Sequence, residues 1–283
     1  MNILKSIKSI FINEGIVHFI KRKRKEYRKL TKDSWYTIKY ENTKTQIFLK
    51  PRNGWVDNFI YENGIYEKDI IDIIKNNVNK ESVFLDVGAN IGQHSLIISH
   101  FCKKVIALEP LPTLANQFLG SIEKNNFKNI EIVRLGAGSE TGETEVYVDV
   151  TQSGYTSILS HLEDMPNLRK DLTHQLEKHI IKIDTLDHIL KDEERIDFIK
   201  MDIEGYEYYA FLGALKTLKK HKPKIILEFS NLFYENHEAG LSEKFFNLIL
   251  SLGYQIKSIE RNVILHRIED IAKEKKQENY FLF

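Results

Sequence analysis

Residues 83–92 read Val-Phe-Leu-Asp-Val-Gly-Ala-Asn-Ile-Gly, and this stretch decides the fold class. Its apolar run, broken only by Asp86, is typical of a strand buried in a parallel sheet. Glycines at 88 and 92 space the turn that follows, and residues 91–101 carry the apolar spacing of a helix packed on that sheet. At such a strand-to-helix turn, the amides of the first helical turn face the ligand, so the stretch predicts a nucleotide-binding loop.

The spacing of the loop argues against a dinucleotide. A dinucleotide fingerprint is G-x-G-x-x-G, and Asn90 stands where its second glycine would be. Asp86 ends the strand where a carboxylate can meet the ammonium and sulfonium groups of S-adenosylmethionine (SAM). The next apolar strand ends on Glu109 and Pro110, where a carboxylate can accept both ribose hydroxyls. We therefore predict SAM binding by Asp86, Gly88, Asn90, Gly92 and Glu109. An NAD-type oxidoreductase and a plain strand–helix turn are the alternatives.

Strand and helix patterns alternate along the rest of the chain. Further strands are expected at 105–108, 131–135, 196–201, 224–229, 254–260, 263–267 and 279–283. This order predicts an α/β fold with a doubly wound, mostly parallel sheet over residues 55–283. Residues 1–54 form a separate extension, in which 34–50 alternate and predict a hairpin turning near 41–45. The connection between the third and fourth core strands is too long for an ordinary loop, so 138–180 is expected to form a lid or substrate wall.

Composition places the chain in a reducing compartment. Its single cysteine, Cys102, excludes an intrachain disulfide and a CxxC motif, and we expect a cytoplasmic protein with this side chain in the core. A chain of 283 residues with 42% hydrophobic content favours one large α/β domain over two small ones. No apolar run reaches the roughly 18 residues of a membrane span.

The net charge of +1 hides an asymmetry. Residues 1–30 carry nine basic and two acidic residues, a net +7, so the remainder is −6. A mildly acidic body disfavours nucleic-acid binding, which needs a concentrated basic surface. Residues 1–30 also show apolar residues at helical spacing. These helices either pack on the domain or contact an anionic membrane at its inner face, or an acidic partner, and both interpretations stay open.

A second group of carboxylates follows the fourth and fifth core strands. Asp202 and Glu204 come directly after the fourth strand, and Glu228 follows the apolar residues of the fifth. Because ligands of doubly wound sheets lie outside the carboxyl ends of the strands, these groups should rim the same crevice as the SAM loop. We predict Asp202 as a general base, with Glu204 or Glu228 orienting the acceptor. Mg²⁺ held by these carboxylates is an open variant. As alternatives, Glu204 and Glu207 could complement a helix dipole, and Glu228 could cap a strand end.

Several motifs together resemble the FkbM-type SAM-dependent methyltransferases. They are Asp86–Gly92, Glu109-Pro110, Thr185–Asp187, Lys200–Glu207 and Glu228-Phe229, with Asn63–Glu67 as a lead-in. The resemblance covers residues 55–283. It implies a seven-stranded, Rossmann-like class I methyltransferase sheet, and it adds Glu67, Ala89, Pro110 and Ala137 to the cofactor site.

The resemblance also implies the reaction. It suggests methyl transfer to oxygen, often a sugar hydroxyl of a glycan, glycolipid or related natural product. The aromatic-proline motif that amine-directed nucleic-acid methyltransferases carry after the fourth strand is absent, and Asp202-Ile-Glu-Gly205 stands in its place. A binding or scaffold protein that keeps the fold without activity is the alternative from another class.

Overall fold

A computed structural model describes residues 30–51, 55–149, 156–157, 176–230, 234, 238–267, 270 and 277–283. The predicted N-terminal helices, within residues 1–29, lie outside the described residues, as does 158–175 of the predicted lid. In the part that is described, no helix has the length and apolar character needed to cross a membrane.

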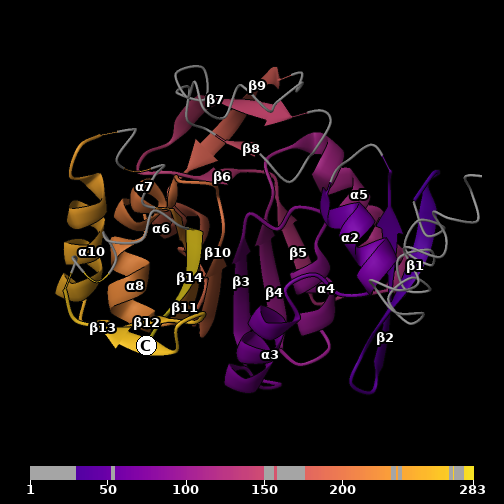
Figure 1. The fold of residues 1–283 in the computed structure, drawn as a ribbon, viewed down its shortest axis with the longest axis horizontal. Coiled ribbons are helices and arrows are strands. Elements are labelled where there is room, and N and C mark those ends of the chain that lie inside the picture. Colours follow the sequence, from indigo (N-terminus) through magenta and orange to yellow (C-terminus); the bar gives the residue numbers. More distant parts are fainter. Residues whose placement is uncertain are drawn as a thin grey trace, which may run out of the picture.

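The main sheet has eight strands among the described residues, in the order β13-β12-β14-β11-β10-β3-β4-β5. The strands are β3 (Val83–Val87), β4 (Lys104–Leu108), β5 (Ile130–Val133), β10 (Phe198–Met201), β11 (Lys224–Ser230), β12 (Ile256–Ser258), β13 (Val263–Leu265) and β14 (Gln277–Leu282). The strands from β11 to β5 are parallel to their neighbours, and β14 is antiparallel to β11 (Figure 1). The predicted doubly wound, mostly parallel α/β sheet is therefore confirmed.

The sheet has one strand more than the resemblance implied. β13 turns back after β12 and pairs with it antiparallel at the edge. Asn262, in the turn between them, has a φ of 55°, a left-handed conformation that asparagine tolerates better than most residues. The eighth strand is thus the second arm of a local hairpin added to the sheet.

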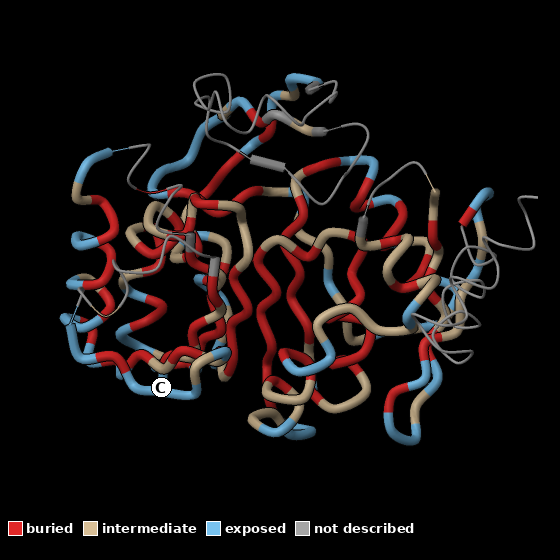
Figure 2. Tube along the Cα trace, in the orientation of Figure 1, coloured by how far each residue is buried: buried red, intermediate tan, exposed pale blue. Residues whose placement is uncertain are grey.

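The central strand β3 is buried along its whole length, as Figure 2 shows for the middle of the sheet. Its side chains alternate between two cores. Leu85 packs in the core that contains Phe211 and Phe245, whereas Phe84 packs in the core that contains Leu96 and Phe118. Burial of one such side chain stabilises the fold by about 1.5–3 kcal/mol, so the apolar run itself fixes β3 between two layers.

Helices cover both faces of the sheet. On one face lie α2 (Trp55–Asn63), α3 (Lys68–Asn77), α4 (Gln93–Ile98) and α5 (Pro112–Asn125), and on the other α6 (Leu186–Ile189), α7 (Glu207–Leu212), α8 (Leu215–His221) and α10 (Leu241–Ser251). α2 was not predicted from the sequence. Its buried Asp57 accepts hydrogen bonds from Lys50 N and Gln117 Nε2, both at 2.7 Å, and so ties α2 to the neighbouring hairpin and to α5.

The predicted hairpin is confirmed. β1 (Ser34–Tyr40) pairs antiparallel with β2 (Thr43–Leu49), and the chain turns at residues 41–42. The hairpin packs on α5, where Asn125 Oδ1 accepts a hydrogen bond from Gln46 N at 2.7 Å. The described part of the extension, residues 30–51, therefore packs together with the rest of the domain.

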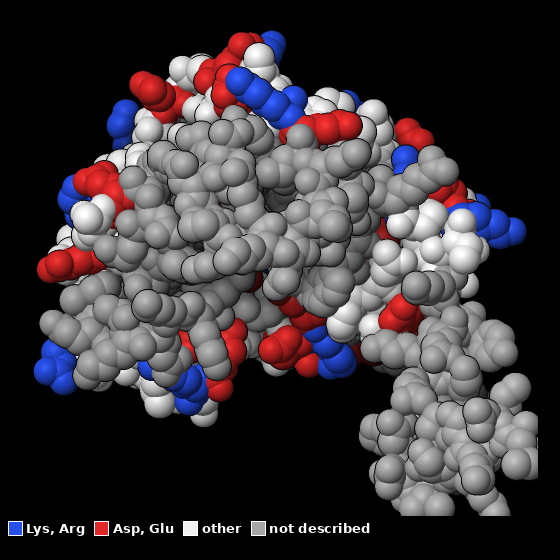
Figure 3. All heavy atoms as spheres, turned by 45° about the horizontal axis from the view of Figure 1, so that its top comes forward, with Lys and Arg blue, Asp and Glu red and all other residues white. Residues whose placement is uncertain are grey.

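The long connection carries a second sheet, with the strand order β6-β9-β7-β8. Its strands are β6 (Gly136–Ala137), β7 (Gly142–Asp149), β8 (Thr156–Ser157) and β9 (Leu176–Asp184). This sheet lies beyond the ends of the main parallel strands, at the top of Figure 1. Figure 3 turns that end toward the viewer, and the described side chains on it carry both charge signs. The lid role of 138–180 and the exclusion of nucleic acid stay predictions.

Candidate active site

Crowding by the protein itself explains both glycines of the loop after β3. Gly88 and Gly92 have φ of 84° and 82°, which disfavours any residue with a Cβ. A Cβ on Gly88 would lie 2.0 Å from the main-chain oxygen of Asp202, and one on Gly92 would lie 2.1 Å from the ring of Phe118. The missing Cβ atoms therefore admit the end of β10 and the side of α5.

Hydrogen bonds within the protein occupy every amide of residues 88–92. Gly88 N and Ala89 N donate to Leu108 O at 3.1 and 2.9 Å, and Gly92 N donates to Ala89 O at 2.8 Å. Asn90 N donates to Glu109 Oε2 at 2.9 Å, and Ile91 N donates to the Asn90 side chain at 2.8 Å. A pyrophosphate needs such amides as donors. The loop therefore disfavours a dinucleotide on geometry as well as on spacing.

Glu109 lies where a ribose-binding carboxylate was predicted. Its Oε1 accepts from Leu111 N and its Oε2 from Asn90 N, both at 2.9 Å. Each carboxylate oxygen keeps a second lone pair, so both can still accept a hydroxyl. Burial raises the pKa of Glu109 to about 7. Pro110 links Glu109 to α5, and the buried Ala137 lies in β6.

Asp86 and Lys200 form the buried ionic centre of the site. They are paired neighbours on β3 and β10. Ser95 Oγ donates to Asp86 Oδ2 at 2.7 Å, whereas Asp86 Oδ1 has no hydrogen-bond partner among the described residues. The Lys200 ammonium is buried and donates to Asp202 Oδ2 at 2.9 Å. Burial opposes its charge, but Asp202, Asp86 and Glu67 raise the pKa of Lys200.

Sequence reasoning assigned no role to Lys200 or His94. Lys200 was quoted only within a motif, although a lysine inside the apolar run Phe198–Met201 is a signal that a buried partner exists. His94 is buried in α4, and its Nε2 lies 3.5 Å from Glu67 Oε2. Burial and the nearby Lys200 ammonium lower the pKa of His94, so its imidazole is neutral at pH 7.

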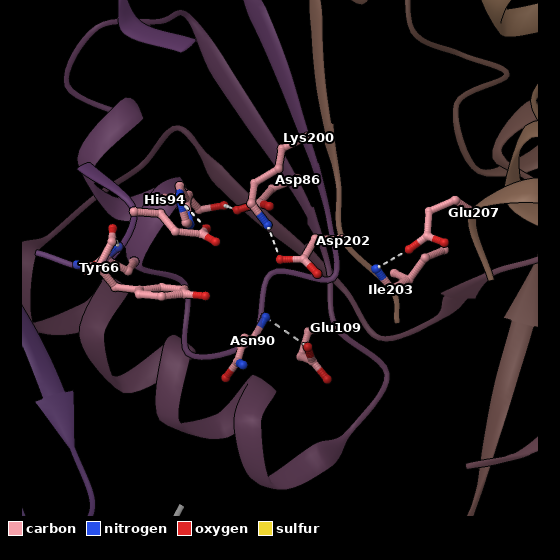
Figure 4. A network of polar contacts seen from close by, with 12 residues as sticks. Tyr66, Asp86, Asn90, His94, Glu109, Lys200, Asp202, Ile203 and Glu207 are labelled. Carbon is pink, nitrogen blue, oxygen red and sulfur yellow. Dashed lines mark hydrogen bonds and ion pairs between the residues drawn. The ribbon is translucent and has the colours of Figure 1, made fainter. Parts of the chain in front are cut away.

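Glu67 stands at the mouth of this centre, immediately before α3, with a φ of 48°. Burial raises its pKa to about 7, against the opposing pull of Lys200. The main chain beside it is fixed by Gln93: Tyr66 N donates to Gln93 Oε1, and Gln93 Nε2 donates to Tyr66 O, both at 2.8 Å. Figure 4 shows Tyr66, His94, Lys200 and Asp202 around one space with the loop at Asn90.

The second carboxylate group is brought together as predicted. One carboxylate oxygen each from Asp202, Glu204 and Glu228 lies within 4.8 Å of the others, and all three residues are half-buried. Burial, Asp202 and Glu207 raise the pKa of Glu204 well above its usual value. Burial also acts to raise the pKa of Asp202, but Lys200 and a hydrogen bond from Glu228 outweigh it, so that pKa is lowered. Asp202 is the ionised member of the group.

Glu207 has a role other than dipole complementation. Fully buried at the start of α7, its Oε1 accepts from Ile203 N at 3.0 Å and from Gly205 N at 3.3 Å. The Tyr234 hydroxyl donates to its Oε2. Glu207 therefore holds the turn that presents Asp202 and Glu204, as Figure 4 shows for its bond to Ile203.

Glu207→Gln should make the protein less sensitive to rising pH. Burial raises the pKa of Glu207 to about 7, so its protonated form favours folding at low pH, and this contribution is lost as pH rises through about 7. The glutamine variant lacks this titration. The melting temperature of Glu207→Gln relative to that of the wild type should therefore rise between pH 5.5 and pH 8, as measured by calorimetry. A constant difference over that range would contradict the assignment, and exposed Glu123→Gln is the control.

The described carboxylates of the site outnumber its cations. The carboxylates are Asp86, Glu109, Glu67, Asp202, Glu204 and Glu228, whereas the described cation among them is the ammonium of Lys200, which Asp202, Asp86 and Glu67 face, and His94 is neutral. A bound cation would favour the ionised forms of Asp86, Glu67 and Glu109, whose pKa values burial raises, so this set of carboxyl groups favours a cationic ligand. SAM carries a sulfonium and an ammonium, so the unpartnered Asp86 oxygen and the two oxygens of Glu109 fit this cofactor.

Comparison with known proteins identifies the family of this chain. The methyltransferase FkbM domain matches residues 86–256, more than half of the chain, and the chain belongs to this family.

Individual relatives are distant. AMB antimetabolite synthetase AmbE of Pseudomonas aeruginosa is 25% identical over 235 residues, which cover 73% of this chain and 11% of that protein. A crystal structure of an FkbM methyltransferase from Methylobacillus flagellatus is 19% identical, covers 81% of this chain and 52% of its own, and has a TM-score of 0.46. A Streptococcus mutans protein of the methyltransferase type, in complex with SAH, is 14% identical over 76% of this chain and 95% of its own, with a TM-score of 0.40.

Proposed function

We propose that this chain is a SAM-dependent methyltransferase that acts on oxygen, and that its acceptor is a sugar hydroxyl of a glycan, glycolipid or related natural product. The carboxylate group Asp202–Glu204–Glu228 at the strand ends carries the proposal. An alkyl hydroxyl is a poor nucleophile at neutral pH and needs a base that removes its proton as the new bond forms. A site for an amine acceptor has less need of an ionised carboxylate beside groups that can hydrogen-bond to the acceptor.

Asp202 serves as the base in this proposal. Its lowered pKa, caused by Lys200 and Glu228 against the effect of burial, keeps it ionised at neutral pH and able to receive the hydroxyl proton. Burial raises the pKa of Glu204 well above its usual value, and the protonated form that this favours can donate a hydrogen bond to the acceptor. When bound, SAM supplies the methyl group, whose transfer to oxygen breaks its bond to sulfur and leaves S-adenosylhomocysteine.

Mg²⁺ remains a variant of this proposal. The oxygens of Asp202, Glu204 and Glu228 lie close enough together to hold a divalent cation, with waters in the remaining positions. Turnover that is unchanged after EDTA treatment and dialysis excludes it. Turnover that is lost with EDTA and restored by Mg²⁺ supports it.

Glu109→Ala should weaken SAM binding by about 10- to 100-fold, the worth of one or two hydrogen bonds to a charged group. The carboxylate of Glu109 is the described group best placed for the ribose, and its loss also frees the amides of Asn90 and Leu111. Isothermal titration with SAM measures the effect, and exposed Glu123→Ala on α5 is the control. Unchanged affinity in Glu109→Ala, or NAD binding by the wild type, would return the alternative of an oxidoreductase.

The acceptor is identified by incubating the protein with methyl-labelled SAM and fractionated cell material. Label in the glycan fraction supports the sugar proposal, and label in a small-molecule fraction supports a natural product, the class suggested by the match to an antimetabolite synthetase. Mass spectrometry of the purified protein tests the scaffold alternative. Bound SAM or S-adenosylhomocysteine without transfer to any fraction favours it.

A further inference from the structure

Tyr66 is the residue of the site to which nothing above gives a function. It lies between α2 and α3, and its main chain is fixed on both sides by the two hydrogen bonds to Gln93, the first residue of α4. The Tyr66 ring meets Phe59 of α2 edge-on, with centroids 5.5 Å apart and planes at 71°. Tyr66 is therefore fixed to the same loop-helix unit that carries Gly88–Gly92.

The Tyr66 hydroxyl lies among carboxylates. It is hydrogen-bonded to Glu67, and the charges of Asp202 and Glu228 act on it as well. Asp202 and Glu228 lie at the ends of β10 and β11 and belong to the carboxylate group that we propose to bind the methyl acceptor. Figure 4 shows the hydroxyl directed into the space between Asp202 and Asn90. The phenol therefore lies between the cofactor loop and the carboxylate group.

The hydrogen bonding of a phenol limits what Tyr66 can do there. A phenol has one proton and two lone pairs. An ionised Glu67 can only accept, so the phenol donates its proton to that carboxylate. The hydroxyl oxygen is then an acceptor toward the open side of the site, and a ligand group next to it must be a donor.

We propose that Tyr66 is a positioning residue for the methyl acceptor: its oxygen accepts a hydrogen bond from the hydroxyl next to the one that is methylated. The inference rests on the proposed function and deepens it, because it selects an acceptor with two neighbouring hydroxyls, as in a sugar diol. Asp202 receives the proton of the reacting hydroxyl, and Tyr66 holds the neighbouring one.

The test is Tyr66→Phe, which keeps the ring contact with Phe59 and removes only the oxygen. The matched control is Tyr61→Phe, on α2 and close to Tyr36 instead. A panel of methyl glycosides is screened with labelled SAM, and the best substrate is compared with its monodeoxy analogues. Tyr66→Phe should raise KM for the parent glycoside about 3- to 10-fold, with kcat changed less and SAM affinity by titration unchanged. On the analogue that lacks the neighbouring hydroxyl, wild type and variant should have equal KM.

Other outcomes overturn the inference. Weaker SAM binding in Tyr66→Phe would assign the residue to the cofactor, and an equal rise in KM on every deoxy analogue would make its role structural. If wild type binds SAM but methylates no glycoside, the sugar proposal fails separately. The rate at which cell fractions are labelled is then compared between wild type and Tyr66→Phe at a limiting concentration of acceptor. Equal rates contradict the role of Tyr66. If Tyr66→Phe does not fold, 3-fluorotyrosine is placed at position 66 instead. The fluorine resonance of the SAH-loaded protein is then recorded with and without the same acceptor fraction. A resonance that does not shift when the acceptor is added contradicts the inference.

Discussion

Lys200→Met should lower the free energy of unfolding by about 3–5 kcal/mol, the cost of removing one partner from a buried ion pair. The ammonium of Lys200 is almost fully buried and lies among Asp202, Asp86 and Glu67. Methionine fills a similar volume but leaves these largely buried carboxylates without the cation that they share. Urea unfolding measures the loss, and titration should show SAM binding reduced as well, because Asp86 of β3 and Asp202 after β10 lose the ammonium that acts on both.

Lys104→Met is the matched control. Lys104 is also in a parallel strand and also pairs with two carboxylates, Glu131 at 3.0 Å and Glu193 at 2.6 Å, but its side chain is 33% exposed. Exposed pairs contribute less than about 1 kcal/mol. Because protonation relieves the unpaired carboxylates, the loss in Lys200→Met should also be smaller at pH 5.5 than at pH 8. Equal losses in the two lysine variants would mean that Lys200 does not organise the site.

The sequence predicted the parts of the site that follow directly from strand ends. Asp86, Glu109, Asp202 and Glu228 each lie within or just after an apolar run, and parallel strands bring such positions to one edge. Their convergence needed no side-chain detail. The doubly wound sheet followed for the same reason, since alternating strand and helix patterns leave few topologies.

The parts that were missed depend on register and on contacts distant in sequence. Lys200 gains meaning only when β10 pairs with β3 and sets it beside Asp86. His94 and Glu67 meet because α3 and α4 pack together. Next to them, Tyr66 and Gln93 are hydrogen-bonded although 27 positions separate them along the chain. α2 was missed because its nine residues include several polar ones, and its stability depends on Asp57 bonding to two other elements. Gly88 was recognised from the sequence, but the contact that requires a glycine there was not, because the main chain of Asp202 lies 114 positions further along the chain.

Asp202→Asn should lower kcat by about 10²–10⁴-fold, the usual contribution of a general base, while SAM affinity changes little. Asparagine keeps the shape and can still accept from Lys200 through its oxygen, but it cannot take the hydroxyl proton. Asp197→Asn is the matched control, because Asp197 precedes the same strand at its opposite end, where it accepts from Val83 N at 2.7 Å. That variant should lose some stability and keep its turnover.

If Asp202→Asn retained near-wild-type turnover on the true acceptor, the base would have to be another carboxylate of the group. Glu204→Gln and Glu228→Gln would then be compared, and a loss confined to one of them would identify it.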